Sequence, residues 1–352
     1  MTLFKYRPLS EFLFKELYYQ ELYFACYSEL NDPLDLTVNI DFIPKEENQV
    51  EYLIYALYKS TFFFDVKNEK EKENMRHLMS FISSKESKRE VMLNIYYQLT
   101  KLSQTITLVT IDTLERIVLD ATKDLEVTFN FTAFKSDIER LTKKIFENSS
   151  TTCFSETNNN FLMWSHYASK HSGICLEFTT EKYGLFPFKI DIKGEQRKYF
   201  KDKEIDDDEI ILPERMSKVL YTNDRPQINF FDFAPVFENE HDCDLLGLSK
   251  SWTHRFAYEL EKVFSNKTTP WQYEKEWRAI HINFGDSLEP EERIKNYPIK
   301  SLSSIYFGTR TPENVKNRIF KIFKIKHPNL KYFNCKLTSG KELEFEEWEY
   351  NE

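Results

Sequence analysis

The chain has 352 residues, of which 41% are hydrophobic and 30% are charged, values typical of a folded globular protein and not of a disordered one. The formal charge of −9 argues against broad adhesion to nucleic acid or anionic lipid, and the seven glycines form no GxGxxG or GxxxxGK[ST] phosphate-binding loop. No signal-peptide pattern and no membrane-length apolar run is present, so we expect a cytoplasmic protein without membrane contact.

The first 40 residues combine short apolar runs with turn-forming residues. Pro8 ends the first run, because it cannot continue a strand and biases Arg7 towards extended backbone. The expected elements are a strand over residues 3–7, a helix over 11–19 capped by Ser10, a strand over 22–26 and a turn at Asn31-Asp32-Pro33.

Residues 45–148 have a different pattern. Apolar residues recur at intervals of three and four, charged residues fill the other positions, and no Gly or Pro occurs after Pro44. This pattern predicts several amphipathic helices. We interpret the stretch as a helical insertion into a discontinuous core domain formed by residues 1–44 and 149–352.

Strands and helices alternate in the rest of the chain, and the connections are mostly too short for regular crossovers. This arrangement predicts an α+β fold with a mixed central sheet. The expected strands cover residues 152–156, 174–178, 218–221, 271–282 and 302–307, followed by a last strand before an acidic C-terminus. The expected helices cover residues 161–168, 245–265 and 314–325, and an acidic solvated loop is expected over 201–209.

The five cysteines are scattered through the chain, and none forms a CxxC pair. We therefore expect neither a disulfide framework nor a zinc site, and no metal cofactor. Cys153 and Cys175 lie in apolar strand-like runs and are interpreted as small core residues.

The segment 271–278 is the most informative motif. If it is a strand, two sets of side chains lie on opposite faces: Tyr273, Lys275 and Trp277 on one, and Glu274, Glu276 and Arg278 on the other. Two carboxylates at the edge of an apolar core would have shifted pKa values, as a ribose-binding or cation-stabilising site requires. The structural alternative is an exposed edge strand with a Glu/Arg ladder.

Three further segments contain polar residues that could bind a ligand. Lys5 and Arg7 share one face of the first strand and could receive a phosphate or a carboxylate, unless they are solvated or Arg7 pairs with Glu276. Helix 161–168 is mostly core, but His166 and Tyr167 carry polar tips. The acidic residues at 32 and 35 are most simply part of a turn, with a metal site as the alternative.

Five motifs occur in a fixed order along the chain. They are Phe4-Lys5-Tyr6-Arg7, Leu22-Tyr23-Phe24 with Asn31-Asp32-Pro33, Cys153-Phe154-Ser155-Glu156, Met163-Trp164-Ser165-His166-Tyr167-Ala168 with residues 173–178, and Tyr273-Glu274-Lys275-Glu276-Trp277-Arg278. Together they resemble the bacterial family catalogued as domain of unknown function 2971, over nearly the whole chain apart from the insertion. The resemblance implies a bacterial origin and an association with defence or mobile gene neighbourhoods, and the family name implies no activity.

The order of elements is also similar to that of ADP-ribosyltransferase-like folds, which begin with a strand bearing His or Arg and end near a strand with a Glu-x-Glu pair. This likeness implies that Arg7 takes the first-strand position and that Glu274 and Glu276 take the acidic positions. Glu276 would be the catalytic carboxylate, binding the nicotinamide ribose and stabilising the oxocarbenium-like state. Tyr167 would stack on the nicotinamide.

The favoured hypothesis is a bacterial defence or toxin-type enzyme that uses NAD as its substrate, either transferring ADP-ribose or cleaving the glycosidic bond. Its acceptor would be a protein or a nucleic acid. The predicted catalytic residues are Arg7, Glu274 and Glu276, and the predicted NAD-binding residues are Lys5, Tyr6, His166, Tyr167 and Arg278.

Two alternatives belong to other classes. A metal-dependent nuclease would use Asp32, Asp35, Glu156 and Glu276 as ligands and would need Mg²⁺ or Mn²⁺ and a basic groove. A non-catalytic sensor or interaction module would use the aromatic motifs as core and the helical insertion as a surface for a protein partner. Convergence of Arg7, His166, Tyr167 and Glu276 on one pocket would favour an enzyme.

Overall fold

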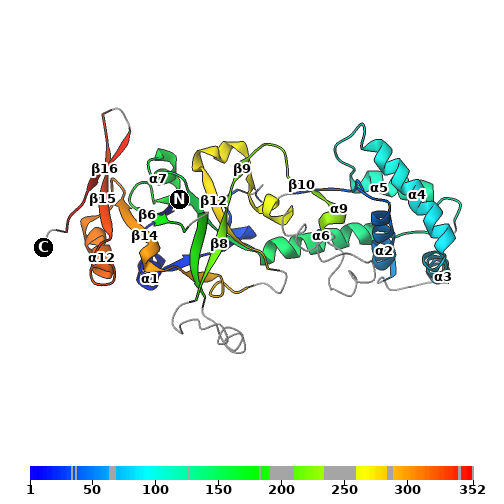
Figure 1. Ribbon diagram of the computed structural model, residues 1–352, viewed down its shortest axis with the longest axis horizontal. Helices are drawn as coiled ribbons and strands as arrows, with labels where there is room; N and C mark the ends of the chain where they lie inside the picture. Colours follow the sequence, from blue (N-terminus) through cyan, green and yellow to red (C-terminus); the bar gives the residue numbers. More distant parts are fainter. Residues whose placement is uncertain are drawn as a thin grey trace. The chain divides into compact units, whose positions relative to one another are not determined.

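The protein is described by a computed structural model (Figure 1). The structure describes residues 1–32, 35, 38–62, 69–125, 127–181, 184–190, 210–233, 259–283, 288–339 and 342–350. The chain divides into two compact units. Unit 1 comprises Met1–Asp35, Glu147–Asn223 and Ser265–Glu352, and unit 2 comprises Leu36–Phe146 and Asp224–Phe264.

Unit 1 is built around a 12-stranded mixed sheet with the order β16-β15-β14-β6-β1-β5-β12-β8-β7-β13-β2, to which β3 is added beside β5. The strands are β1 (Thr2–Arg7), β2 (Glu21–Tyr23), β3 (Ala25–Cys26), β5 (Ser150–Ser155), β6 (Ile174–Thr179), β7 (Leu185–Ile190), β8 (Ile210–Lys218), β12 (Glu276–His281), β13 (Ile294–Asn296), β14 (Leu302–Phe307), β15 (Lys331–Leu337) and β16 (Leu343–Glu347). The pair β14–β15 is parallel and is connected through α12 (Glu313–Phe323), whereas the other pairs of this sheet are antiparallel. The predicted α+β fold with a mixed sheet is confirmed.

The two faces of this sheet carry different groups, and β1 shows the division. Leu3 packs in a core with Leu13 and Leu17 of α1 (Glu11–Tyr19), whereas Tyr6 packs in a second core with Trp164 of α7 (Phe161–Tyr167). Because side chains alternate along a strand, residues 3, 5 and 7 lie on the α1 face and residues 4 and 6 on the α7 face.

The same alternation places the predicted acidic residue of β12. In the register of the sheet, Phe4 of β1 is opposite Ser155 of β5, and Ser155 is opposite Glu276 of β12. Paired residues of neighbouring strands project to the same side of a sheet. Glu276 therefore lies on the α7 face with Phe4, opposite to the face that carries Lys5 and Arg7.

Unit 2 contains mainly helices and has its own apolar core. Its elements are β4 (Asn39–Asp41), α2 (Asn48–Phe62), α3 (Glu69–Ser83), α4 (Lys85–Leu102), α5 (Ile111–Ala121), α6 (Phe131–Asn148), β10 (Gln227–Asn229) and α9 (Phe230–Phe233), and residues 259–264 are also helical. Buried side chains from α2 to α6 pack around Phe42, Phe230 and Phe231. The amphipathic helices predicted from the sequence are confirmed. In the described part of the chain, no helix is both long and apolar enough to cross a membrane.

The predicted strand over residues 271–282 is wrong in its first half. Residues Thr269–Glu274 form a 3₁₀ helix, η3, with Pro270 in its first turn, and Lys275 follows in the left-handed region with φ 46° and ψ 53°. Pro270 cannot donate a ladder hydrogen bond, and the left-handed residue reverses the direction of the chain before β12. The alternation argument therefore applies to Glu276 and Arg278 and not to Glu274.

The structure also tests several smaller predictions about strands and cysteines. The predicted strand 22–26 is divided into β2 and β3 at Phe24, whose N–H donates to the carbonyl of Arg293. Strands β7 and β13, and most of β8, were not predicted. Cys175 is fully buried, which confirms its assignment to the core, and Cys153 is half-buried. The acidic segment 201–209, Cys243 and residues 245–258 of a predicted helix lie outside the described residues.

Candidate functional site

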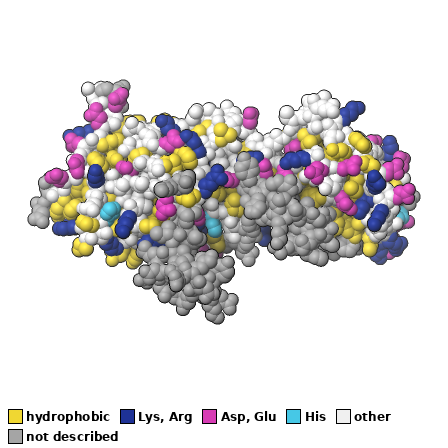
Figure 2. Space-filling model, in the orientation of Figure 1, with side chains coloured by type: hydrophobic (Ala, Val, Ile, Leu, Met, Phe, Trp, Pro, Cys, Tyr) yellow, Lys and Arg dark blue, Asp and Glu magenta, His cyan; other side chains and the backbone are white. Residues whose placement is uncertain are grey.

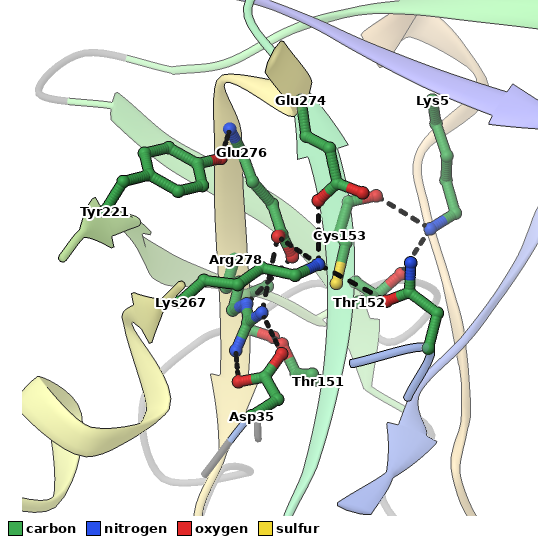
Figure 3. Close-up of polar contacts among 12 residues, drawn as sticks. Lys5, Asp35, Thr151, Thr152, Cys153, Tyr221, Lys267, Glu274, Glu276 and Arg278 are labelled. Atoms are coloured by element: carbon green, nitrogen blue, oxygen red, sulfur yellow. Dashed lines mark hydrogen bonds and ion pairs between the residues drawn. The ribbon is translucent and has the colours of Figure 1, made fainter. Parts of the chain in front are cut away.

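A cluster of buried charged side chains lies on the α7 face of unit 1 (Figure 3). Arg278 of β12 is fully buried, and its guanidinium donates to both carboxylate oxygens of Asp35, at 2.9 and 2.6 Å. Its Nε also donates to Oε1 of Glu276 at 2.8 Å. Glu276 and Arg278 are two residues apart on one strand, so both project to the same face.

Lys267 connects this pair to the second predicted carboxylate. Its Nζ is 2.7 Å from Oε2 of Glu274 and 3.3 Å from Oε2 of Glu276, and the three side chains are at most 4% exposed. The strand β11 (Asn266–Lys267) positions the lysine by pairing with β9 (Leu220–Tyr221). The hydroxyl of Tyr221 accepts a hydrogen bond from the backbone N–H of Glu276 at 2.8 Å.

The cluster reaches the surface through two polar residues. The hydroxyl of Tyr167 donates to Oε1 of Glu274, and the side-chain amide of Asn31, an exposed residue, donates to the same hydroxyl. The Oδ1 of Asn31 is also 3.3 Å from the Nζ of Lys267. Glu274 is therefore the carboxylate on the side of the cluster that faces solvent, behind Tyr167 and Asn31.

Aromatic side chains surround this outer side. The ring of His166 is 5.9 Å from that of Tyr273, and the ring of Trp271 is 6.2 Å from Tyr273. The Nζ of Lys267 lies 4.8 Å from the centre of the Trp271 ring. Such an aromatic environment can stack against a planar or cationic ring.

The two glutamates have opposite protonation tendencies. Burial alone would raise the pKa of Glu276, but the charges of Arg278 and Lys267 outweigh burial and hold that pKa well below its usual range. Burial raises the pKa of Glu274, and the negative charge of Glu276 opposes the stabilising effect of Lys267. Glu274 is therefore easier to protonate than Glu276.

The predicted residues of β1 lie elsewhere. Arg7 forms an ion pair with Glu16 of α1, and not with Glu276. Lys5 donates to Oγ1 of Thr152 at 2.7 Å and to the carbonyl of Cys153 at 3.0 Å. Tyr6 is buried, and its hydroxyl donates to the carbonyl of Thr157 at 2.8 Å.

The structure therefore brings together five predicted residues and separates three. Those brought together are His166, Tyr167, Glu274, Glu276 and Arg278, and those separated are Lys5, Tyr6 and Arg7. Convergence of Arg7, His166, Tyr167 and Glu276 on one pocket would favour an enzyme. Arg7 does not meet this criterion, because its side chain and that of Glu276 are on opposite faces of the sheet.

The four acidic residues of the nuclease alternative do not form one group of ligands. Asp35 and Glu276 both bind Arg278, whereas Glu156 accepts from Lys218 and from Nε1 of Trp277. Asp32 accepts from the hydroxyl of Thr268 at 3.0 Å. Within the described ranges, no group of three or more His, Cys, Asp or Glu side chains is arranged to hold a metal ion.

The sequence does not identify Lys267 or Tyr221 as residues of the cluster. Neither lies in a motif, and only the pairing of β9 with β11 brings them to β12. Asp35 was noted only as an alternative metal ligand. A buried Glu-x-Arg pair needs further charged partners. From the sequence, this requirement predicts that residues such as Lys267 and Asp35 exist, but not where in the chain they lie.

The fold and the site define an α+β protein in which a buried network of acidic and basic side chains lies between a mixed sheet and a short aromatic helix. Residues 163–279 match the family described as "Protein of unknown function (DUF2971)". Over this range the match supports the family that the motifs predicted, and the range includes Tyr167, Lys267, Glu274, Glu276 and Arg278. Neither a curated protein nor a solved structure matches the chain.

Proposed function

We propose that the protein acts on the N-glycosidic bond of NAD, releasing nicotinamide and passing ADP-ribose to water or to a protein or nucleic-acid acceptor. The observation that supports this proposal is the pair of buried glutamates of opposite protonation tendency that share Lys267 beneath an aromatic surface. Pairs of carboxyl groups whose environments separate their pKa values are typical of glycosidic chemistry. The likeness to ADP-ribosyltransferases stays a prediction.

The roles of the two glutamates follow from their contacts. Both oxygens of Glu276 bind Arg278, and Lys267 binds one of them, so this carboxylate holds the two cations in place. Glu274 lies behind Tyr167 and Asn31, and a ribose that displaced these two residues would meet it. In its ionised form, which the charge and hydrogen bond of Lys267 favour, Glu274 would accept a hydrogen bond from a ribose hydroxyl and stabilise the positive charge that develops as nicotinamide leaves with the bonding electron pair.

Nicotinamide release by the purified full chain tests the proposal. We expect Glu274→Gln to lower the rate about a hundred- to thousand-fold, the usual cost of removing one group that stabilises the transition state. Glu276→Gln should also lower the rate, because it loosens Lys267 and Arg278. The matched control is Glu156→Gln, which removes a carboxylate that binds Lys218 and Trp277 outside the cluster.

Labelled NAD with a bacterial lysate distinguishes hydrolysis from transfer, since only transfer leaves the label on a macromolecule. A fall of cellular NAD on expression in bacteria would support a toxin or defence role. If the folded wild type releases no nicotinamide with or without lysate, the proposal fails, and the cluster has a structural or binding role.

A further inference from the structure

A pocket of about 480 Å³ lies beside α1 in unit 1. Its walls come from the end of β1, from α1, from β2 and from the segment that leads into β13. The volume is within the range of small-molecule sites. Because Arg7 is part of its wall, the pocket lies on the face of the sheet opposite to Glu276.

Five charged side chains line the pocket, and their charges do not cancel. Arg7 pairs with Glu16, and the Nζ of Lys15 is 3.4 Å from Oε2 of Glu21. The fifth is Glu291, which is exposed and has no ion pair within the described residues. Two cations and three anions leave one net negative charge, so the lining attracts a cation and has no spare cation for a phosphate or carboxylate.

The remaining wall is largely apolar. Phe12 of α1 is 71% exposed, although its neighbour Leu13 is fully buried in the core. Ile294 and Pro290 add aliphatic surface. Tyr23 is fixed in the wall, because its hydroxyl donates to Glu29 at 2.7 Å and its ring contacts the guanidinium of Arg293 at 5.1 Å.

We propose that this pocket binds a small organic cation, namely an ammonium group attached to an aromatic or aliphatic body. The ammonium group is balanced by the carboxylate of Glu291, and the body covers Phe12 and Ile294. Ammonium ions are attracted both by carboxylates and by aromatic faces, which this lining combines. The site is independent of the proposed NAD chemistry, because it shares no residue with the cluster around Lys267.

Binding of 2-phenylethylamine to the full chain, measured by calorimetry, tests this proposal. Phenylacetate and 2-phenylethanol keep the ring and replace the positive charge by a negative charge or none. We expect saturable binding of the amine and weaker binding of both controls. Glu291→Gln should weaken amine binding about three- to fivefold, as expected for an exposed charge pair. Phe12→Ala should weaken the binding of all three ligands.

Glu289→Gln is the matched control, since it removes an exposed carboxylate of the same segment that does not line the pocket. It should leave the affinity for the amine unchanged. The proposal is overturned if the amine does not bind at millimolar concentration or if phenylacetate binds equally well. It is also overturned if Glu291→Gln and Glu289→Gln have the same effect, because the attraction would then come from the general surface charge.

Discussion

Lys5 shows how burial changes the chemistry of a single side chain. It was predicted to receive an anionic ligand, but its ammonium group donates to a hydroxyl and a carbonyl and lies 5.1 Å from the ring of Phe154. Burial, together with the positive charge of Arg7, lowers the pKa of Lys5 to about 8. In the folded protein this amine therefore loses its proton more easily than an ordinary lysine.

This shift predicts a pH dependence of stability. Between about pH 8 and 10.5, Lys5 is protonated in the unfolded state and loses its proton in the folded state. Because the unfolded state then binds more protons, the contribution of Lys5 to the free energy of unfolding rises with pH. Lys5→Met should remove that contribution. Urea unfolding of both proteins across this range measures it, with the exposed Lys331→Met as control. Equal slopes for wild type and Lys5→Met would contradict the prediction.

At the scale of elements, the sequence pattern predicts residues of the cluster but not the backbone structure that brings them together. The Glu-x-Glu-x-Arg pattern identified three residues of the cluster, because charged residues beside an apolar strand are seldom buried without partners. It could not show that Glu274 belongs to a 3₁₀ helix or that Lys267 binds both glutamates. These features depend on Pro270, on a left-handed Lys275 and on the pairing of β9 with β11, which joins segments far apart in sequence.

The first strand shows a similar limit of prediction from sequence. Its alternation correctly predicted that Lys5 and Arg7 share a face, but the sequence does not tell which face of a sheet the other motifs occupy. That choice depends on the order β1-β5-β12, a non-local pairing. The unpredicted strands β7 and β13 have the same cause, because they are stabilised mainly by their neighbours.

The turn between α7 and β6 is tightly constrained. Ser169, Lys170 and His171 all have positive φ, at 47°, 53° and 69°. Gly173 follows, and a Cβ atom there would lie 2.3 Å from the carbonyl oxygen of Arg7. The absence of a side chain at Gly173 allows β6 to begin directly beside β1.

Gly173→Ala should therefore destabilise the protein by about 3 kcal/mol, the upper end of typical overpacking, because the atom that must move belongs to the backbone. Gly184→Ala is the comparison. Its φ of 72° disfavours a side chain, but the nearest atom is the flexible end of Met1 at 3.6 Å. We expect Gly184→Ala to lower the free energy of unfolding by about 1 kcal/mol. Chemical unfolding measures both changes, and a cost at Gly173 no larger than that at Gly184 would refute the packing argument.

At the scale of the whole molecule, the chain has separate apolar cores. The core of unit 2 is built from its helices, whereas unit 1 has one core on each face of its sheet. Charges of both signs are interspersed on the face shown in Figure 2. This mixture, like the net charge, gives little support to a broad nucleic-acid surface, and a nucleic-acid acceptor would need a local site.

Separate cores predict that the two units unfold separately. Far-ultraviolet circular dichroism reports mainly on the long helices of unit 2. Four of the five tryptophans, all except Trp252, belong to unit 1, so fluorescence of a Trp252→Phe protein reports on unit 1. In that background, Leu57→Ala removes a fully buried side chain of unit 2 and should cost about 2–5 kcal/mol.

The urea transition followed by circular dichroism should then shift to lower concentration, while the fluorescence transition stays in place. Leu176→Ala, which opens a cavity in the core of unit 1, should shift the fluorescence transition instead. If both probes moved together in both variants, the two units would form one cooperative structure, and the helices of unit 2 would contribute to the stability of the sheet that carries Glu274 and Glu276.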